Sequence, residues 1–472
     1  KNGKEYRDFI LNLRLTVKEY EFAKRAFSGG FTHSNPAKTN DVYENVASYD
    51  IASSYPAVMI SKKYPMDSGR FIPTIKKSDF DNIIHNDSYF MIFTVRLENI
   101  RPKFGHEFCI SESKCLRGTL KKAIVTNGRI YKADALEIVT TSIDMRIIEK
   151  CYDFVIPKIG IGDCYLYHTD YLPKPIIECI LDLYGDKTQL KASNEMLNGI
   201  YGMSVTDIVR DIIEYNTTEN KWKDITPAFK IDESEKIKIL QKSDHAQRKF
   251  LYYMWGVAIT AYARFALWTA IFELGGDYIY SDTDSVKFIN HEKHTKFFEN
   301  YNMKIQYEIM NCLIHYKLNP NAARPKDKKG NIKPMGIYEF EGIYTHFKTL
   351  GAKRYLYRDE CGFFHLTCAG VKPETAVEYL LKSSIMMTEK QYIDMVFERF
   401  KIGMIIPAEY TGKQTHSYID DEFTVDLVDA DGIKCTVHEL SCIHLSPCDF
   451  DTNKKSARAF MQFVTEFCAK KM

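Results

Sequence analysis

Two carboxylates two residues apart are the side chains of this sequence best suited to bind a cation. Asp282 and Asp284 lie in Tyr-Ser-Asp-Thr-Asp-Ser (280–285), between the apolar runs 278–280 and 286–288. The pattern predicts a β-hairpin over 277–290 with both acids at its bend. Two anions beside buried strands are costly unless a cation neutralises them, and hard oxygen ligands with open positions suit Mg²⁺. The alternative is an ordinary polar turn, because Asp and Ser are common turn residues.

A second candidate is Asp50, in Tyr-Asp-Ile-Ala-Ser-Ser-Tyr-Pro (49–56). Residues 46–51 are predicted to form a short strand, and the chain then turns into a helix. Backbone N–H groups at the start of a helix can hold phosphate oxygens. The alternative is that Asp50 is a simple helix N-cap.

A third candidate is a polar stripe on a predicted helix. Its members follow one another at steps of four and three residues, so they share one helix face: Lys187, Lys191, Asn194, Asn198 and Tyr201. Such a stripe could hold the triphosphate, base and sugar of a nucleotide. The alternative is a solvated helix face. Two helices are predicted here, over 176–184 and 188–200, with a break at Gly185.

Length and composition limit the classes of protein. The 472 residues, 45% hydrophobic, are enough for two to four structural units. The net charge is +2, so any nucleic-acid surface must be a local patch. The sequence has 12 Cys and no CxxC pair, which argues against a zinc ribbon and favours free thiols in a reducing cytosol. The apolar stretch 255–274 contains Arg264 and is interpreted as a buried helix, not a membrane span.

Other elements are predicted from periodicity and turn residues. Helices are expected over 17–26, 252–274 and 455–470. Strands are expected at 90–97, 123–131, 337–341, 353–358, 363–367, 423–428 and 435–438. Residues 322–333 are expected to form an exposed basic loop. Residues 435–448 contain three Cys and two His at a spacing that is no standard zinc signature, so buried Cys in strands is favoured over a metal site.

The three candidate segments, in their order along the chain, resemble motifs A, B and C of family-B DNA polymerases. The spacing is most similar to the protein-primed phage branch. Further segments resemble motifs of that branch: Phe-Ser-Gly-Gly (27–30) its Tyr-x-Gly-Gly, Thr-Ala-Tyr-Ala-Arg (260–264) its Thr-Ala-x-x-Arg, and Lys-Arg-Tyr (353–355) its Lys-x-Tyr. The resemblance extends from about residue 15 to 430.

The resemblance implies an α+β right-hand fold with palm, fingers and thumb and an antiparallel palm sheet. Its segments would be a first part of the palm (1–56), an insertion similar to the terminal-protein region (57–170), fingers with a second insertion (171–250), a second part of the palm (251–360), and palm edge, thumb and C-terminal extension (361–472). The branch's N-terminal exonuclease domain has no counterpart in the sequence.

The resemblance also implies roles for single residues. Asp50 and Asp284 would bind two Mg²⁺ ions, with Mn²⁺ able to substitute, Asp282 would support them, and the Ile51 carbonyl would be a backbone ligand. The incoming nucleotide would be bound by Ala52, Ser53, Ser54, Tyr55, Asn198, Tyr201 and Gly202. DNA would be contacted by Gly29, Gly30, Thr260, Ala261, Arg264, Thr283, Lys353 and Tyr355.

Two departures from the family pattern concern contacts to the substrates. The Tyr of Tyr-x-Gly-Gly is Phe27 here, and the family's helix Lys is Asn194. Lys191 or Lys187 must then supply a charge to the triphosphate, and Lys191 is favoured because it is nearer Tyr201.

The expected function is DNA-templated addition of deoxynucleotides to a primer 3′-OH, in DNA replication, with strand displacement. The expected partners are primer–template DNA and dNTPs, and no membrane; a terminal protein primer and a separate exonuclease are left open. The chain would act in the cytoplasm, that of the host if it is phage-encoded. The alternatives are a catalytically inactive polymerase-like DNA-binding subunit and a reverse transcriptase.

Overall fold

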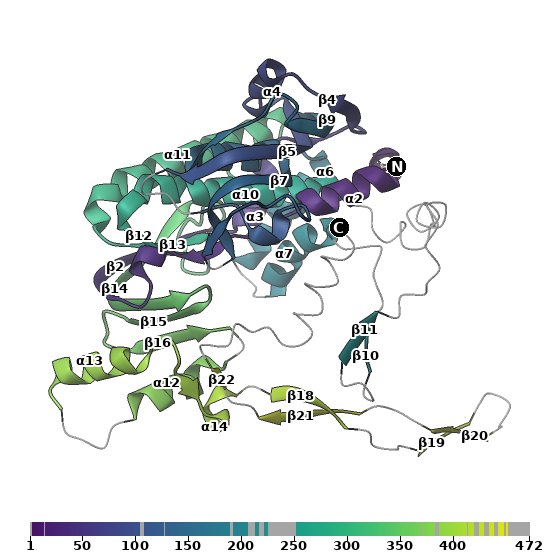
Figure 1. The fold of residues 1–472 in the computed structure, drawn as a ribbon. Helices are drawn as coiled ribbons and strands as arrows, with labels where there is room; N and C mark the ends of the chain where they lie inside the picture. Colours follow the sequence, from purple (N-terminus) through teal and green to yellow (C-terminus); the bar gives the residue numbers. More distant parts are fainter. Residues whose placement is uncertain are drawn as a thin grey trace. The chain divides into compact units, whose positions relative to one another are not determined.

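The computed structural model describes residues 2–13, 15–103, 108–126, 128–188, 192–205, 213–216, 221–224, 252–369, 371–382 and 387–412, with the backbone of short strands between 414 and 451. The chain divides into two compact units (Figure 1). The first comprises residues 1–37, 45–209 and 231–343, and the second residues 38–44, 210–230 and 344–472. Each unit is described by itself.

An antiparallel sheet carries the acidic hairpin in the first unit. Its strands follow the order β1-β12-β13-β2-β14, where β14 continues into the second unit. They are β1 (Thr32–Ser34), β12 (Tyr278–Asp282), β13 (Ser285–Phe288), β2 (Val42–Ile51) and β14 (Tyr338–Gly351). Every side chain of β13 is buried. The hairpin is therefore an interior element of the sheet.

A long apolar helix, α10 (Tyr253–Leu274), forms the centre of the first unit (Figure 1). Its side chains belong to both large hydrophobic clusters of that unit, so it joins them. Around it lie α2 (Val17–Ala26), α3 (Ser54–Ser61), α7 (Ala192–Ser204) and α5 (Ser142–Cys151). Among the described residues α10 is the one helix that is long and apolar enough to cross a membrane, and most of it is buried inside the protein. The prediction of a buried core helix is confirmed.

The insertion after α3 folds as a second antiparallel sheet, in the order β3-β9-β5-β7-β6, with β4 and β8 beside it. Its strands are β3 (Tyr64–Pro65), β4 (Arg70–Thr74), β5 (Tyr89–Pro102), β6 (Ile124–Thr126), β7 (Arg129–Thr141), β8 (Tyr152–Val155) and β9 (Ile161–Asp170). The strands β5 and β7 pair from Ile92 with Thr141 to Ile100 with Ala133. Helix α4 (Lys77–Ile84) buries Phe80 and Ile84 in the same core.

Among the described residues, three further helices belong to the first unit. They are α1 (Asn2–Asn12), α6 (Lys174–Lys187) and α11 (His291–His315). The predicted break at Gly185 is wrong, because α6 continues through it to Lys187. Glycine lowers helix stability by only about 1 kcal/mol relative to alanine, and packing of the neighbouring residues readily outweighs that cost.

The second unit contains the rest of β14, then β15 (Arg354–Arg358) and β16 (Phe364–Cys368), all antiparallel. Helices α12 (Pro373–Leu381), α13 (Glu389–Arg399) and α14 (Ala408–Thr411) follow. Its remaining strands are β10 (Ile213–Asn216), β11 (Lys221–Asp224), β17 (Ile405–Ile406), β18 (Gln414–Ile419), β19 (Thr424–Val428), β20 (Lys434–His438), β21 (Cys442–Pro447) and β22 (Phe450–Asp451). Cys435 and Cys442 lie in strands of two different pairs, β19–β20 and β18–β21.

Most predicted elements are confirmed. They include the helix over 17–26, the strand before residue 51, the hairpin over 277–290 and the strands near 337–367 and 423–438. Within the predicted loop 322–333 most residues are exposed, but Ala323 is buried. The predicted final helix over 455–470 lies outside the described residues.

The contact between α7 and α10 gives a first prediction. A Cβ added at Gly256 would lie 2.2 Å from Val205 Cγ1 and 2.6 Å from Ser204 Oγ, at the end of α7. Gly256→Ala should therefore lower the free energy of unfolding by about 1–3 kcal/mol, as overpacking does. Thermal melting measures this. Gly185→Ala is the control, because its Cβ would meet nothing within 4 Å, so it should leave stability unchanged or raise it.

Candidate active site

The acidic hairpin closes with a two-residue turn. Asp282 pairs with Ser285, and Thr283 and Asp284 connect them. Thr283 has a left-handed φ of 58°, which tight hairpin turns often require. The Asp284 amide donates to the Asp282 carbonyl over 2.6 Å. The turn therefore holds the Asp284 carboxylate at the tip of a rigid hairpin.

Asp50 reaches the same place through the register of the sheet. It lies opposite Ser285, which itself lies opposite Asp282, and Asp282 lies opposite Thr32. These positions form one row across four strands. The Ile51 amide donates to the Asp284 carbonyl over 3.0 Å and so fixes the end of β2 against the turn. The predicted convergence of the two segments is found.

Burial and neighbouring carboxylates disfavour negative charge on both acids. Burial raises the pKa of Asp284 to about 7, with the Asp50 and Asp282 carboxylates adding to the shift. Burial also raises the pKa of Asp50 to about 6, and Glu341 contributes. Lys287 lowers both pKa values without cancelling the shifts. A bound cation would relieve this strain.

The sequence reasoning missed the groups that surround Asp50. Lys287 has a side chain only 5% exposed, and its Nζ lies 3.6 Å from Glu341 Oε2. Ser48 Oγ donates to the same Glu341 oxygen over 2.5 Å. Glu339 also raises the pKa of Asp50. The sequence offered one signal for these groups, namely Lys287, a charged residue among the apolar residues of a short strand.

The carboxylates suit a metal that is also bound by substrate oxygens. Among the side chains that the structure describes, no three His, Cys, Asp or Glu residues converge to hold a metal by themselves. Asp282 Oδ1 accepts a hydrogen bond from Thr32 Oγ1 over 2.7 Å, which fixes it beside the pair. Mg²⁺ is usually bound by one or two carboxylates, waters and substrate phosphates. Asp50 and Asp284 fit such a site.

Helix α3 begins next to Asp50. Its N-cap is Ser53, with a left-handed φ of 55°, so the alternative that Asp50 is a simple N-cap is wrong. The first N–H groups of a helix have no partner within it, and those of α3 start with Ser54 and Tyr55. The Ala52 amide, in contrast, donates to the Ile337 carbonyl over 2.9 Å. The expected role of the Ala52 amide in binding phosphate is therefore wrong.

Two tyrosines and a lysine lie beside the start of α3. The rings of Tyr55 and Tyr201 stack, with centroids 4.4 Å apart and planes at 22°. Lys187 Nζ donates to Ser53 Oγ over 2.8 Å. Burial lowers the pKa of Lys187, whereas Glu339, Asp50 and Asp284 oppose this effect. Lys187 therefore lies at the site.

The remaining residues of the polar stripe lie on α7 or outside the described part. Asn198 and Gly202 are exposed on α7. Lys191 and the side chain of Asn194 are outside the described residues. The structure consequently supports Lys187, the less favoured of the two lysines, as the cation near the acids.

The expected DNA contacts of α10 need correction. Thr260 and Ala261 are fully buried, so they cannot contact DNA directly. Arg264 is 7% exposed, and its Nε and Nη2 donate to Asp144 over 2.9 and 2.7 Å. Its Nη1 donates to the carbonyls of Ser28 and Gly29. Arg264 therefore holds the loop over 28–30 in place.

That loop packs on the acidic hairpin. A Cβ at Gly30 would lie 2.8 Å from Thr283 Cγ2, so only glycine fits without movement. The Thr283 amide donates to the Phe31 carbonyl over 2.8 Å. Gly29 has open space around its Cα. The expected DNA-binding residues Gly29, Gly30 and Thr283 thus lie together.

Lys353 and Tyr355 belong to the second unit. Lys353 has a left-handed φ of 54° in the turn between β14 and β15. The Tyr355 ring lies 5.6 Å from the Phe347 ring.

Comparisons with known proteins concern the sequence of the N-terminal part and the fold. Residues 3–131 match the family described as DNA polymerase type B, organellar and viral. The fold is similar to that of phi29 DNA polymerase complexed with primer-template DNA and incoming nucleotides, with a TM-score of 0.57, 17% identity, 95% of this chain covered and 66% of that chain. It is also similar to the post-translocation binary complex with primer-template DNA, with a TM-score of 0.58, 16% identity and coverages of 93% and 63%. No curated protein matches the sequence significantly.

The chain thus spans slightly less than two thirds of the phi29 chain. The right-hand fold predicted from the motifs is confirmed.

The position of Lys187 gives a second prediction. Lys187→Met should weaken binding of a deoxynucleoside triphosphate in Mg²⁺ about tenfold, because it removes a charged donor worth about 1.5–3 kcal/mol. Equilibrium titration with a fluorescent nucleotide measures this. Lys174→Met, on the same helix, is the control. An unchanged affinity of Lys187→Met, with a loss in Lys191→Met, would restore the original preference for Lys191.

Proposed function

Because the chain has the right-hand fold and, over residues 3–131, the sequence signature of family-B DNA polymerases of the viral kind, we propose that it is a DNA-directed DNA polymerase. It adds deoxynucleotides to a primer 3′-OH along a DNA template. The observation that carries the proposal is the convergence of Asp50 and Asp284, which come from distant segments, so that the Asp50 charge disfavours that of Asp284.

Asp50 and Asp284 would hold two Mg²⁺ ions, with the Ile51 carbonyl as a further ligand and Asp282 in support. Such a pair would supply a lower pKa of the primer hydroxyl and neutralisation of the triphosphate and the leaving pyrophosphate. Lys287, buried in the sheet, pairs with Glu341 and favours the charged form of both carboxylates. Positioning and charge neutralisation supply most of the rate in such reactions.

The incoming nucleotide lies between the start of α3 and the helices α6 and α7. The amides of Ser54 and Tyr55 and the ammonium group of Lys187 bind its phosphates. The Tyr55 ring lies beneath the sugar and is supported by the stacked Tyr201. Asn198 and Gly202 border the base on α7.

The finer points of the function are also proposals. Primer–template DNA and dNTPs are the substrates; phi29 DNA polymerase has been seen in complex with primer-template DNA and incoming nucleotide substrates. Synthesis proceeds with strand displacement, and the insertion over 57–170 clasps DNA and accepts a protein primer if priming uses a protein hydroxyl. A separate exonuclease would be a partner in proofreading. The chain acts in the cytoplasm, that of the host if it is phage-encoded.

Primer extension with single-residue variants tests the activity. Asp50→Ala and Asp284→Ala should each lower extension on a DNA template by at least about a thousandfold, because each removes a ligand of a charge-stabilising metal. Retention of DNA binding is checked by gel shift. Asp153→Ala is the control, since its side chain is 74% exposed.

Each alternative has its own result in this assay. An inactive unmodified chain that still binds primer–template would indicate a DNA-binding subunit. Preferred extension on an RNA template would indicate a reverse transcriptase. Full extension by both alanine variants would contradict the assignment of the acids.

The ring stack predicts the basis of sugar selection. Tyr55→Val removes the ring beneath the sugar and should raise the kcat/KM ratio for ribonucleotide over deoxyribonucleotide at least about a hundredfold. Single-nucleotide insertion kinetics measure both substrates. Tyr55→Phe keeps the ring and should keep selection. An unchanged ratio in Tyr55→Val would assign selection to another group.

A further inference from the structure

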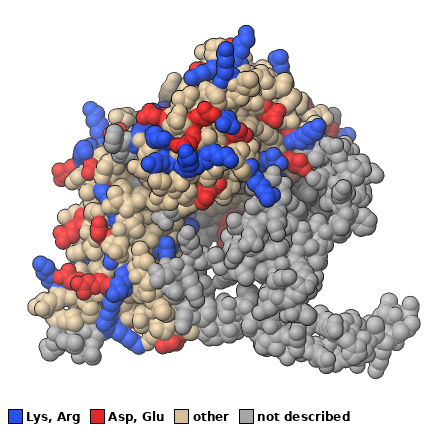
Figure 2. Space-filling view, in the orientation of Figure 1, with Lys and Arg blue, Asp and Glu red and all other residues tan. Residues whose placement is uncertain are grey.

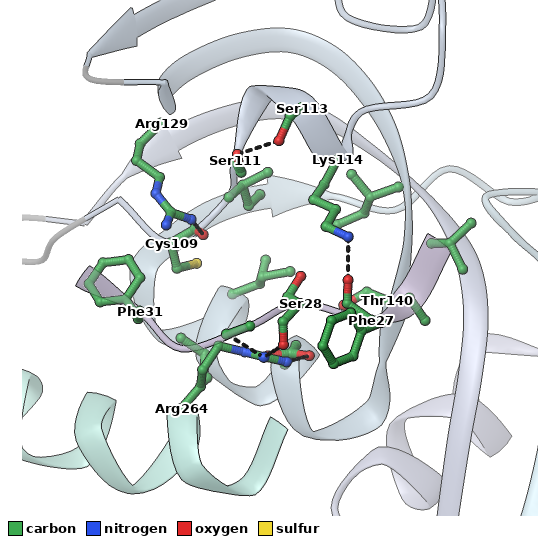
Figure 3. A pocket seen from close by; sticks show the side chains of 18 of the residues that line it. Phe27, Ser28, Phe31, Cys109, Ser111, Ser113, Lys114, Arg129, Thr140 and Arg264 are labelled. Carbon is green, nitrogen blue, oxygen red and sulfur yellow. Dashed lines mark hydrogen bonds and ion pairs between the residues drawn. The ribbon is translucent and has the colours of Figure 1, made fainter. Parts of the chain in front are cut away.

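A cavity of about 320 Å³ lies away from the acidic pair, between the segment 26–31, the insertion and α10. Figure 3 shows Lys114, Arg129 and Arg264 entering it from different sides. Lys114 ends a short 3₁₀ helix (Glu112–Lys114), and Arg129 begins β7. The cavity is thus formed where the insertion meets the Gly29–Gly30 loop.

The charges that line this cavity do not balance. Asp144 is its one carboxylate, and Arg264 neutralises it through a bidentate pair. Neither Lys114 nor Arg129 has a carboxylate within ion-pair distance among the residues that the structure describes. Two positive charges therefore have no anionic partner there.

Carbonyl groups compensate these two cations only in part. Lys114 Nζ donates to the Phe27 carbonyl, and weakly to that of Arg25 over 3.4 Å. Arg129 Nη1 donates to the Cys109 carbonyl over 3.0 Å, and its guanidinium lies 4.7 Å above the Phe31 ring. Guanidinium has five N–H donors and ammonium three, so both groups keep donors for a ligand.

The uncompensated charge has a cost. Burial and the nearby Arg264 lower the pKa of Lys114 to about 8. Burial also lowers the pKa of Arg129. A buried charge is stabilised when an opposite charge is placed beside it. The cavity consequently favours an anionic occupant.

We propose that this cavity binds an oxyanion of the phosphate class between Lys114 and Arg129. A guanidinium fork matches the geometry of two phosphate oxygens. The hydroxyls of Ser111, Ser113 and Thr140 line the same space and can donate to the remaining oxygens. A water molecule takes about 30 Å³ of liquid, so the cavity also has room for a phosphate with some of its waters.

The phosphate has two sources that share this chemistry, a nucleic-acid strand and a free ion. Between Ser113 and Asp134 the sequence has no acid and six basic residues, Lys114, Arg117, Lys121, Lys122, Arg129 and Lys132. Figure 2 shows Lys and Arg gathered on the visible face near β5 and β7. This local basic patch would attract a strand electrostatically.

The test uses the whole chain in EDTA, so that it is independent of the acidic pair and of the proposed activity. Inorganic phosphate should raise Tm by about 2 °C more than chloride at equal ionic strength. Lys114→Met and Arg129→Met should abolish this difference. Arg129→Lys keeps the charge and should preserve most of it, as should Lys122→Met, whose side chain is 86% exposed.

A parallel arm identifies the source. If the ligand is a strand phosphate, affinity for a single-stranded ten-nucleotide oligonucleotide should fall at least about fivefold in Lys114→Met and Arg129→Met, and clearly less in Lys122→Met, which removes only an exposed charge of the patch. If it is a free ion, only the response to phosphate should change. Equal losses in Lys122→Met would reveal diffuse surface charge and overturn the proposal.

The unmodified chain provides a test that does not depend on a variant folding. Phosphate or the oligonucleotide should slow acylation of Lys114 by an amine reagent at least about threefold relative to Lys122, as read by peptide mass spectrometry. No protection of Lys114 by either probe would overturn the proposal.

Discussion

The burial of two neighbouring carboxylates is the constraint on which the candidate site depends. Burial raises the pKa of both Asp50 and Asp284, and the Asp50 charge raises that of Asp284 further. The sheet enforces this arrangement, because the register of β2, β13 and β12 places Asp50, Ser285 and Asp282 in one row. A soft loop would let the acids move apart. The rigid hairpin and the hydrogen bond from Ile51 to Asp284 prevent this, so a bound cation would be needed to stabilise both charges.

Nearby charged groups stabilise the two carboxylates only in part. Lys287 lies in the interior of the sheet and pairs with Glu341, which shares its charge between two partners. Lys187 binds the Ser53 hydroxyl and not a carboxylate, so its charge remains available to a substrate. Complete neutralisation by the protein would remove the reason to bind a metal. Incomplete compensation would suit the proposed ligands, which bring both a cation and an anionic phosphate chain.

The sequence predicted the local elements of this site well, because hairpins and helix starts follow from nearby residues. The Asp-Thr-Asp turn and the strand before Asp50 are examples. Register across the sheet depends on pairing between distant segments, so the partnership of Ser48, Lys287 and Glu341 was not predicted. The break at Gly185 was wrong because tertiary packing outweighs a weak local preference. The roles of Ala52 and Arg264 were misassigned because a motif shows which residue is present and not which atoms its neighbours occupy.

Arg264 and Lys114 differ in how far nearby carboxylates and carbonyls stabilise their positive charges. Arg264 is saturated by Asp144 and two carbonyls, so it acts as a fixed part of the loop that packs on Thr283. Lys114 reaches the same loop through the Phe27 carbonyl but has no anion to balance it. An anion bound at Lys114 would therefore be held against the loop whose other face supports the acidic hairpin. Binding of an anion in the insertion would then be linked to the position of the acidic hairpin through residues 27–31. Within this segment, Gly30 allows close packing against Thr283.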